Sequence, residues 1–337
     1  MAKLKIATTD DAKQYFTTNR ELVDVHDTDF VDVSAVVIDE DDIDVLESVR
    51  KTEFGIPVFI ETKNPDAVDA KILSQIYQLI DTNDKYDQNL VDRSIDHAAT
   101  KYESKILPPF FKELQSYVER GNIQFDCPGH QGGAFFRKHP AGNELYKFYG
   151  ENIFRSDICN ADVDLGDLLI HEGPALAAEK HAAKVYNADR TYFVLNGSST
   201  SNNIALSAPV APGDLVLFDR NNHKSVYNQA LVISGGKPVY MQDSRDPYGF
   251  IGGIYDSDFD EDFLRQQAAK VDPEKAKQKR PFRLAVVQLG TYDGTIANAH
   301  QIIKKIGHLC DYILFDSAWV GYEQFIPFMT QCSPLTM

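Results

Sequence analysis

A run of small and hydroxyl-bearing residues follows a predicted strand and could bind an anion. The apolar segment TYFVL at residues 191–195 predicts the strand, and residues 197–200 read Gly-Ser-Ser-Thr. The next residues can begin a helix, so free backbone N–H groups and the hydroxyls of Ser198, Ser199 and Thr200 could together hold a phosphate. Serine and threonine are also common at helix N-termini, so this turn alone is weak evidence for a site.

Two further predicted strands each end near one residue that could do chemistry. His223 follows the strand LVLFD at 215–219, and Asp316 ends the strand YILFD at 312–316. A histidine ring can stack on a planar cofactor and help in proton transfer, although a hydrogen-bonded loop histidine is the simpler interpretation. A buried carboxylate needs a partner, and a pyridinium nitrogen is one, because the negative charge keeps that ring protonated and able to accept electrons. For Asp316 taken alone, a helix cap is the alternative.

A parallel sheet would bring these strand ends together. From residue 190 onward the chain repeats an apolar strand, small or polar residues, and usually a helical segment. Another such strand, RLAVVQL at 283–289, ends in a Gly-Thr-Tyr-Asp-Gly-Thr segment that could simply be a tight turn. Ligands of open α/β sheets collect at the C-terminal strand ends, so we expect His223 and Asp316 to face one cavity beside Ser198 to Thr200.

Residues 1–107 predict a separate, flavodoxin-like domain in which strands and helices alternate. The predicted strands are 4–8, 21–25, 34–39 and 57–62, and the predicted helices are 11–18, 41–50, 68–82 and 89–106. The helix at 68–82 rests on Ile72, Ile76, Leu79 and Ile80, which recur at helical spacing. Pro108 and Pro109 cannot continue the last helix, so they mark the boundary to a second domain.

Acidic residues near the strand ends of this first domain raise the possibility of phosphotransfer. Asp10, Asp11 and Asp39 stand where phosphate-accepting receiver domains keep their acidic cluster. Acidic residues after strands are common helix caps, however, and no final strand carrying a lysine can be recognised. Capping is therefore the favoured interpretation.

Bulk composition limits the classes of partner. The chain has 337 residues, with 34 Lys and Arg against 50 Asp and Glu, and the resulting net charge of −16 disfavours nucleic acid and anionic membranes as partners. The four cysteines are widely spaced, which predicts neither a metal site nor a disulfide framework. Neither a signal-peptide-like segment nor a long apolar run occurs, so we expect a cytoplasmic protein.

Taken in order, these features resemble the bacterial ornithine/lysine/arginine decarboxylase family, whose members are pyridoxal-phosphate enzymes of fold type I. Long ungapped motifs carry the resemblance along the whole chain: CPGHQGG at 127–133, DLGDLLIHEGP at 164–174, NADRTYFVLNGSST at 187–200, DRNNHKS at 219–225, TYDG at 291–294 and DSAWV at 316–320. The resemblance implies an α/β chain. A flavodoxin-like wing domain at 1–107 would serve assembly, and residues 108–337 would form a linker and an incomplete large domain of the pyridoxal-phosphate-dependent transferase fold.

The resemblance also implies the cofactor pyridoxal 5′-phosphate and a role for each candidate residue. The residues implied to bind it are Ser198, Ser199, Thr200, His223, Asp316, Ala318 and Trp319. The three hydroxyl residues would hold the phosphate. The implied catalytic residues are His223, stacked on the ring, and Asp316, paired with the pyridine nitrogen. Ala318 would lie against the opposite ring face and Trp319 near the phenolic oxygen.

The implied reaction is decarboxylation of a basic amino acid, most closely L-ornithine to putrescine, with lysine and arginine as alternative substrates. The family binds its cofactor covalently through a Ser-x-His-Lys segment soon after the DSAWV strand, and residues 321–337 contain no such segment. We therefore expect a truncated chain that is inactive alone, although full-length members would form homo-oligomers. The alternatives are a non-catalytic assembly module acting through the wing domain and, less favoured, an aminotransferase.

Overall fold

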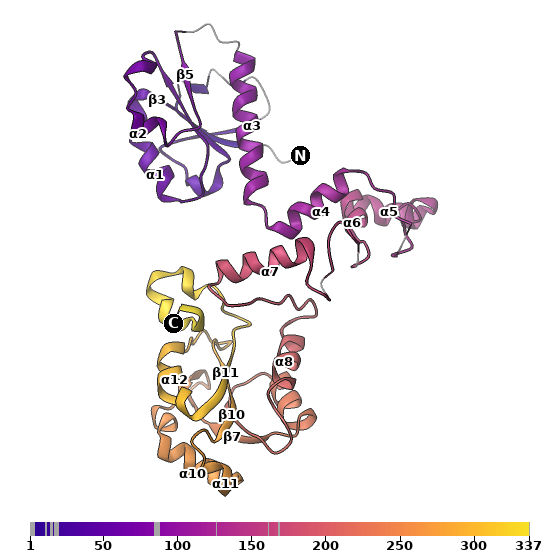
Figure 1. The fold of residues 1–337 in the computed structure, drawn as a ribbon, viewed down its shortest axis with the longest axis vertical. Coiled ribbons are helices and arrows are strands. Elements are labelled where there is room, and N and C mark those ends of the chain that lie inside the picture. The colour runs from indigo at the N-terminus through magenta and orange to yellow at the C-terminus, as the bar shows by residue number, and fades with distance from the viewer. Residues whose placement is uncertain are drawn as a thin grey trace. The chain divides into compact units, whose positions relative to one another are not determined.

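The computed structural model describes residues 4–10, 12–13, 16, 20–83, 88–125, 127–160, 162–167 and 169–336. The chain divides into two compact units, Met1–Ala178 and Glu179–Met337 (Figure 1). Each unit contains its own parallel sheet.

The first unit is built on a five-stranded sheet in which every pairing is parallel. Its strands are β1 (Lys5–Thr8), β2 (Glu21–Asp24), β3 (Ala35–Asp39), β4 (Val58–Thr62) and β5 (Gln78–Asp81). Their spatial order, β2-β1-β3-β4-β5, is the order of flavodoxin-like folds. The predicted flavodoxin-like architecture is therefore confirmed.

Helices cover both faces of this sheet (Figure 1). β3 illustrates the division, because successive side chains of a strand point to opposite faces. Val36 belongs to a buried cluster with α1 (Val45–Lys51), whereas Val37 belongs to a cluster with α3 (Gln88–Ile106). Apolar residues at its first four positions thus give β3 two buried faces.

The prediction of one helix over residues 68–82 was wrong. This segment forms the short helix α2 (Ala70–Leu73) and then β5, in which Leu79 pairs with Ile60 of β4. Ile80 is 1% exposed in the core of the sheet. Pairing beside a buried strand outweighed the helical spacing of the isoleucines, because tertiary packing overrides local periodicity in short segments.

β5 is also the final strand that the sequence did not reveal, and it ends in Asp81 rather than in a lysine. The helix predicted at 41–50 is realised as a 3₁₀ turn, Glu40–Asp42, followed by α1. Much of the helix predicted at 11–18 lies outside the described residues.

The remainder of the first unit consists of helices and connecting loops. These helices are α4 (Pro109–Glu119), α5 (Pro140–Tyr149), α6 (Glu151–Ser156) and the start of α7 (Gly173–Val185). α3 ends at Ile106 and α4 begins at Pro109, so the two prolines separate helices as predicted. Along the sequence, the first compact unit ends at Ala178 and the second begins at Glu179. The domain boundary expected at 107/108 stays a prediction.

The second unit contains a four-stranded sheet, again with only parallel pairings, in the order β11-β10-β6-β7. Its strands are β6 (Leu215–Asp219), β7 (Lys237–Met241), β10 (Phe282–Gln288) and β11 (Cys310–Asp316), and a separate antiparallel hairpin consists of β8 (Asp243–Arg245) and β9 (Ile251–Ile254). Its helices are α8 (Ser198–Ser207), α9 (Lys224–Tyr227), a π-helix (Asn228–Ile233), α10 (Glu261–Val271), α11 (Pro273–Ala276) and α12 (Ala299–Ile306).

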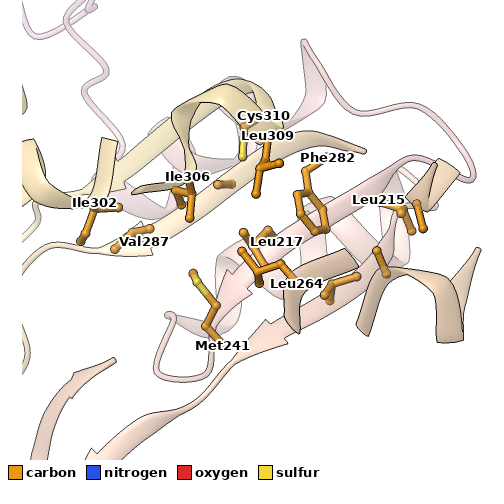
Figure 2. Close-up of a cluster of buried hydrophobic side chains, with 14 residues drawn as sticks. Leu215, Leu217, Met241, Leu264, Phe282, Val287, Ile302, Ile306, Leu309 and Cys310 are labelled. Carbon is orange, nitrogen blue, oxygen red and sulfur yellow. The ribbon is translucent and has the colours of Figure 1, made fainter. Parts of the chain in front are cut away.

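Two apolar cores lie on opposite faces of this sheet. On one face Leu217 and Val287 pack with residues of α10 and α12 (Figure 2). On the other face Phe218 and Val286 pack with Leu206 of α8. Because side chains alternate along a strand, Asp219 at the end of β6 projects toward the face of Leu217, away from α8.

The strand predicted at 191–195 was wrong. These residues lie in an irregular segment before α8, and Leu195 is 78% exposed. A strand needs a neighbour for its ladder of hydrogen bonds, and no pairing among the described strands includes this segment. Conversely, β7 was missed, since Pro238 within it argues against a strand when only the sequence is considered.

Candidate active site

A cavity of about 500 Å³ lies in the second unit at the C-terminal ends of β6, β10 and β11. Six of the seven predicted cofactor residues line it: Ser198, Ser199, His223, Asp316, Ala318 and Trp319. Parallel neighbouring strands end at the same edge of a sheet, so residues far apart in sequence meet there. In particular, His223 and Asp316 face one cavity, as the sequence predicted.

The N-terminus of α8 supplies the anion-binding side of the cavity. Gly197 is the N-cap residue, and no side chain caps this end of the helix. Its φ of 83° is in the left-handed region that favours glycine. Ser198 and Ser199 are exposed, so their hydroxyls are available to an anion. The backbone N–H groups at the start of a helix have no acceptor within the helix and can bind the same anion.

Thr200 is the predicted residue that does not line the cavity. Its hydroxyl donates a hydrogen bond to the carbonyl oxygen of Asn196, 3.0 Å away. The group is thus already used within the turn, and its role toward a phosphate stays a prediction.

Asp316 is a buried carboxylate on the cavity wall, with 6% of the residue exposed. The Nδ2 group of Asn202 donates to its Oδ2 atom at 2.9 Å, and the backbone N–H of Ala318 donates to its Oδ1 atom at 3.2 Å. Two donors hold the carboxylate in place, and a carboxylate has lone pairs left for a further donor in the cavity.

His223 precedes α9 and is oriented by that helix. The backbone N–H of Ser225 donates to its Nδ1 atom at 3.3 Å, which makes His223 the N-cap residue. The Oγ atom of Ser225 lies 2.8 Å from the same ring nitrogen. Both contacts use Nδ1, so the imidazole is held by one edge.

Asn202 and Ser225 connect the two candidate catalytic residues, and sequence reasoning missed both. The Nδ2 group of Asn202 also donates to the Oγ atom of Ser225, at 3.3 Å. One signal was available for Asn202, because it follows Ser198 by four residues and so lies on the same side of a helix that begins there.

Asp219 supports the loop that carries His223. Only 1% of Asp219 is exposed, and its carboxylate accepts hydrogen bonds from the backbone N–H groups of Asn221 and Gln288 and from the Nδ2 group of Asn222. Burial raises the pKa of Asp219 to about 7. These bonds fasten the end of β6 to the end of β10.

The rest of the wall consists of residues to which sequence reasoning assigned no role: Asn221, Asn222, Lys224, Gln288, Gly290, Thr291 and Tyr292. The rings of Tyr292 and Trp319 lie 5.1 Å apart, and both side chains are largely exposed. They form an aromatic rim.

In the described part of the chain, no cluster of three or more histidine, cysteine, aspartate or glutamate side chains could hold a metal ion. None of the helices in those residues combines the length and the apolar character needed to cross a membrane.

Comparison with protein families gives two matches. Residues 4–102 match the Orn/Lys/Arg decarboxylase N-terminal domain, and residues 108–337 match the Orn/Lys/Arg decarboxylase major domain. The two matches together span nearly the whole chain.

Individual relatives agree with these matches. The chain is 65% identical over 334 residues to an inducible ornithine decarboxylase of Lactobacillus sp. (strain 30a), an alignment covering 99% of this chain and 46% of the relative. It is 62% identical over 338 residues to an ornithine decarboxylase of Haemophilus influenzae, covering 100% of this chain and 47% of the relative. The chain therefore spans about half the length of the curated relatives it matches.

A solved structure resembles the whole chain. The crystal structure of a Francisella novicida lysine decarboxylase superimposes with a TM-score of 0.83 at 27% sequence identity, covering 99% of this chain and 49% of that one.

Proposed function

The chain belongs to the Orn/Lys/Arg decarboxylase family, and from this we propose that its cavity binds pyridoxal 5′-phosphate and that the full-length protein decarboxylates L-ornithine to putrescine. The observation that carries the proposal is the position of Asp316. It is a buried carboxylate in a cavity whose other side is the open N-terminus of α8. A cofactor with an anionic phosphate and a basic ring nitrogen requires that pair of features.

The residues present fit this cofactor. Ser198, Ser199 and the first N–H groups of α8 would hold the phosphate, and Asp316 would accept a hydrogen bond from the protonated ring nitrogen. His223 would lie against the ring. When bound, the cofactor supplies an electron sink for the bond that breaks, and the charge of Asp316 keeps that sink effective.

Ornithine is proposed as the substrate because the chain shares more sequence identity with ornithine decarboxylases than with a lysine decarboxylase. The two ornithine decarboxylases are 65% and 62% identical to this chain, whereas the Francisella novicida lysine decarboxylase is 27% identical in the structural superposition. Substrates of this class share an α-amino acid group and differ in the length and end group of the side chain.

Cofactor binding can be tested on this chain alone. Trp319 is the only tryptophan, and it lines the cavity, so its fluorescence should report occupancy directly. We expect saturable quenching by pyridoxal phosphate. Pyridoxal, which lacks the phosphate, should bind with an affinity at least about tenfold lower. Equal affinities for the two compounds would show that α8 does not bind the phosphate.

The substrate requires the full-length protein that contains this chain. Amine release from ornithine, lysine and arginine should be measured in parallel at equal concentrations. We expect the highest kcat/KM for ornithine. A preference for lysine or arginine would disprove the substrate proposal and leave cofactor binding unaffected.

A further inference from the structure

We infer that Asn202 and Ser225 are positioning residues that hold His223 as a neutral ring with its hydrogen on Nε2 and orient the Asp316 carboxylate toward the cavity. The inference rests on the proposed function, which gives His223 and Asp316 their roles, and it adds the two residues that prepare them. It follows from the direction of each hydrogen bond between these four side chains.

The direction at His223 is fixed by the backbone. A backbone N–H group can only donate, and that of Ser225 lies 3.3 Å from Nδ1, so Nδ1 carries no hydrogen. The hydroxyl of Ser225, 2.8 Å from the same nitrogen, then also acts as a donor, and the two donors share the single lone pair of Nδ1. A ring with an unprotonated Nδ1 is neutral and carries its hydrogen on Nε2.

The direction at Asp316 is fixed by its charge. An ionised carboxylate only accepts, so the amide nitrogen of Asn202 faces it at 2.9 Å. An amide nitrogen has two hydrogens, and the second is directed to the Oγ atom of Ser225 at 3.3 Å. That oxygen has given its own hydrogen to His223 and so is free to accept.

Both hydrogens of the Asn202 amide and the hydroxyl hydrogen of Ser225 thus meet an acceptor, and the bonds run from Asn202 in both directions. Asn202 is 7% exposed and Asp316 is 6% exposed, so water cannot easily replace a lost donor. Buried networks of this kind are rigid when all their members are satisfied.

The chemical consequence concerns the charge of the ring that lies against the cofactor. A protonated imidazole would place a positive charge against a pyridinium ring and oppose the charge that Asp316 stabilises. A neutral imidazole can stack without that repulsion. Asn202 and Ser225 would thus favour the cationic cofactor ring from both sides of the cavity.

The tautomer can be observed without cofactor or activity. In the chain labelled with ¹⁵N-histidine at about pH 8, where histidine is ordinarily neutral, the His223 signals are identified by their loss in His223→Gln. We expect hydrogen on Nε2 in the wild type. In Ser225→Ala and Asn202→Leu the backbone N–H of Ser225, at 3.3 Å the more distant donor, acts without a well-placed hydroxyl, so part of the population should shift to the Nδ1 tautomer. Ser225→Thr keeps the hydroxyl and should restore the wild-type pattern. Hydrogen on Nδ1 in the wild type, or an unchanged pattern in Asn202→Leu, would overturn the inference.

Affinity for pyridoxal phosphate, followed by Trp319 fluorescence, gives a second readout. Asn202→Leu should weaken binding roughly tenfold or more, because the carboxylate loses a buried donor. Asn203→Leu is the matched control: it alters the next residue of α8, which does not line the cavity, and should leave affinity within about twofold.

Comparison with Asp316→Asn separates this inference from the proposed function. Weaker binding in both Asn202→Leu and Asp316→Asn supports the inference and the proposed function. Weaker binding in Asp316→Asn alone removes the role of Asn202 and leaves the proposed function standing. Unchanged binding in Asp316→Asn contradicts the proposed function and, with it, any role of Asn202 in preparing that carboxylate.

Discussion

Parallel strands end in aspartate in both units, but the two environments differ. Asp39 ends β3 of the first unit, and its side chain accepts a hydrogen bond from the backbone N–H of Asp41 at 3.0 Å, as the cap of a 3₁₀ turn. Asp316 ends β11 of the second unit, where it is buried on a cavity wall and held by Asn202. The same local sequence, an apolar run ending in aspartate, therefore produces a cap in one unit and a candidate catalytic carboxylate in the other.

The difference comes from what surrounds each strand end. In the first unit the residues directly after β3 fold into a turn that uses the carboxylate locally. In the second unit, α8 and the loops after β6 and β10 enclose the end of β11. A carboxylate at the end of a strand can take part in chemistry when residues far away in sequence form a cavity around it. The comparison can therefore be tested by substituting residues of one unit at a time.

The largest effect is expected from removing the charge of Asp316. In the full-length protein, Asp316→Asn should lower kcat/KM for ornithine by about a thousandfold, roughly 4 kcal/mol, because the cofactor ring loses its charged partner. Asp39→Asn is the matched control and should change kcat/KM by less than about twofold, since it affects a cap. A comparable loss in both variants would mean that the two aspartates do not differ in function.

The second effect concerns an ion pair that belongs to the first unit. The Arg20 side chain is 5% exposed and pairs with Asp92 and Asp96, with 2.7 Å between Arg20 Nε and Asp96 Oδ1. Arg20→Ala should lower the free energy of unfolding of the first unit by about 3 kcal/mol, because the buried carboxylate of Asp92 loses a cation.

Hydrogen exchange of the β1–β4 amides would measure the effect of Arg20→Ala, while Trp319 fluorescence reports pyridoxal phosphate binding in the second unit. Binding should not change. Weakened binding would show that the stability of the first unit controls the cavity, contrary to the division drawn above.

A third effect follows from the raised pKa of Asp219. Its pKa of about 7 in the folded chain lies above the ordinary unfolded value of about 3.9, so folding favours the protonated form. The stabilisation, about 4 kcal/mol in all, is complete below about pH 4 and is lost as the pH rises through about 7; about 2 kcal/mol of it is lost between about pH 5.5 and 8. Urea unfolding followed by Trp319 fluorescence should show this decline in the wild type and a flatter profile in Asp219→Asn. A wild-type profile that rises over this range would contradict the direction of the pKa shift.

The smallest effect distinguishes two neighbouring hydroxyls. Ser199 lines the cavity, whereas the hydroxyl of Thr200 donates to the Asn196 carbonyl. Ser199→Ala should weaken pyridoxal phosphate binding about fivefold, roughly 1 kcal/mol, and Thr200→Ala should weaken it less. The reverse order would indicate that the Thr200 hydroxyl turns toward the phosphate when the cofactor binds.

Much of the architecture could be predicted from local sequence. The apolar runs at β3, β4, β6 and β10 specify buried strands, the run at β11 specifies a partly exposed edge strand, and Pro108 and Pro109 separate two helices. A helix was expected to follow the Gly-Ser-Ser-Thr turn, and α8 begins within that turn, at Ser198. Each of these features depends on residues that are close together in the chain.

Features that depend on distant partners could not be predicted in this way. Residues 78–81 belong to a segment whose apolar residues recur at helical spacing, yet they form β5 because they pair with the neighbouring strand β4. Residues 191–195 have a strand-like composition, yet they form no strand because none of the described strands pairs with them.

The candidate site shows the same limit at the level of single side chains. The sequence identified His223 and Asp316 by residue type and position after a strand, and motif resemblance supplied their proposed roles. Asn202, by contrast, contacts a residue 114 positions away, and its amide has a partner only once α8 lies beside the end of β11. The sequence by itself determined which groups are present, and the tertiary structure decided which hydrogen bonds connect them, because a hydrogen bond depends on distances and angles that only the packed chain establishes.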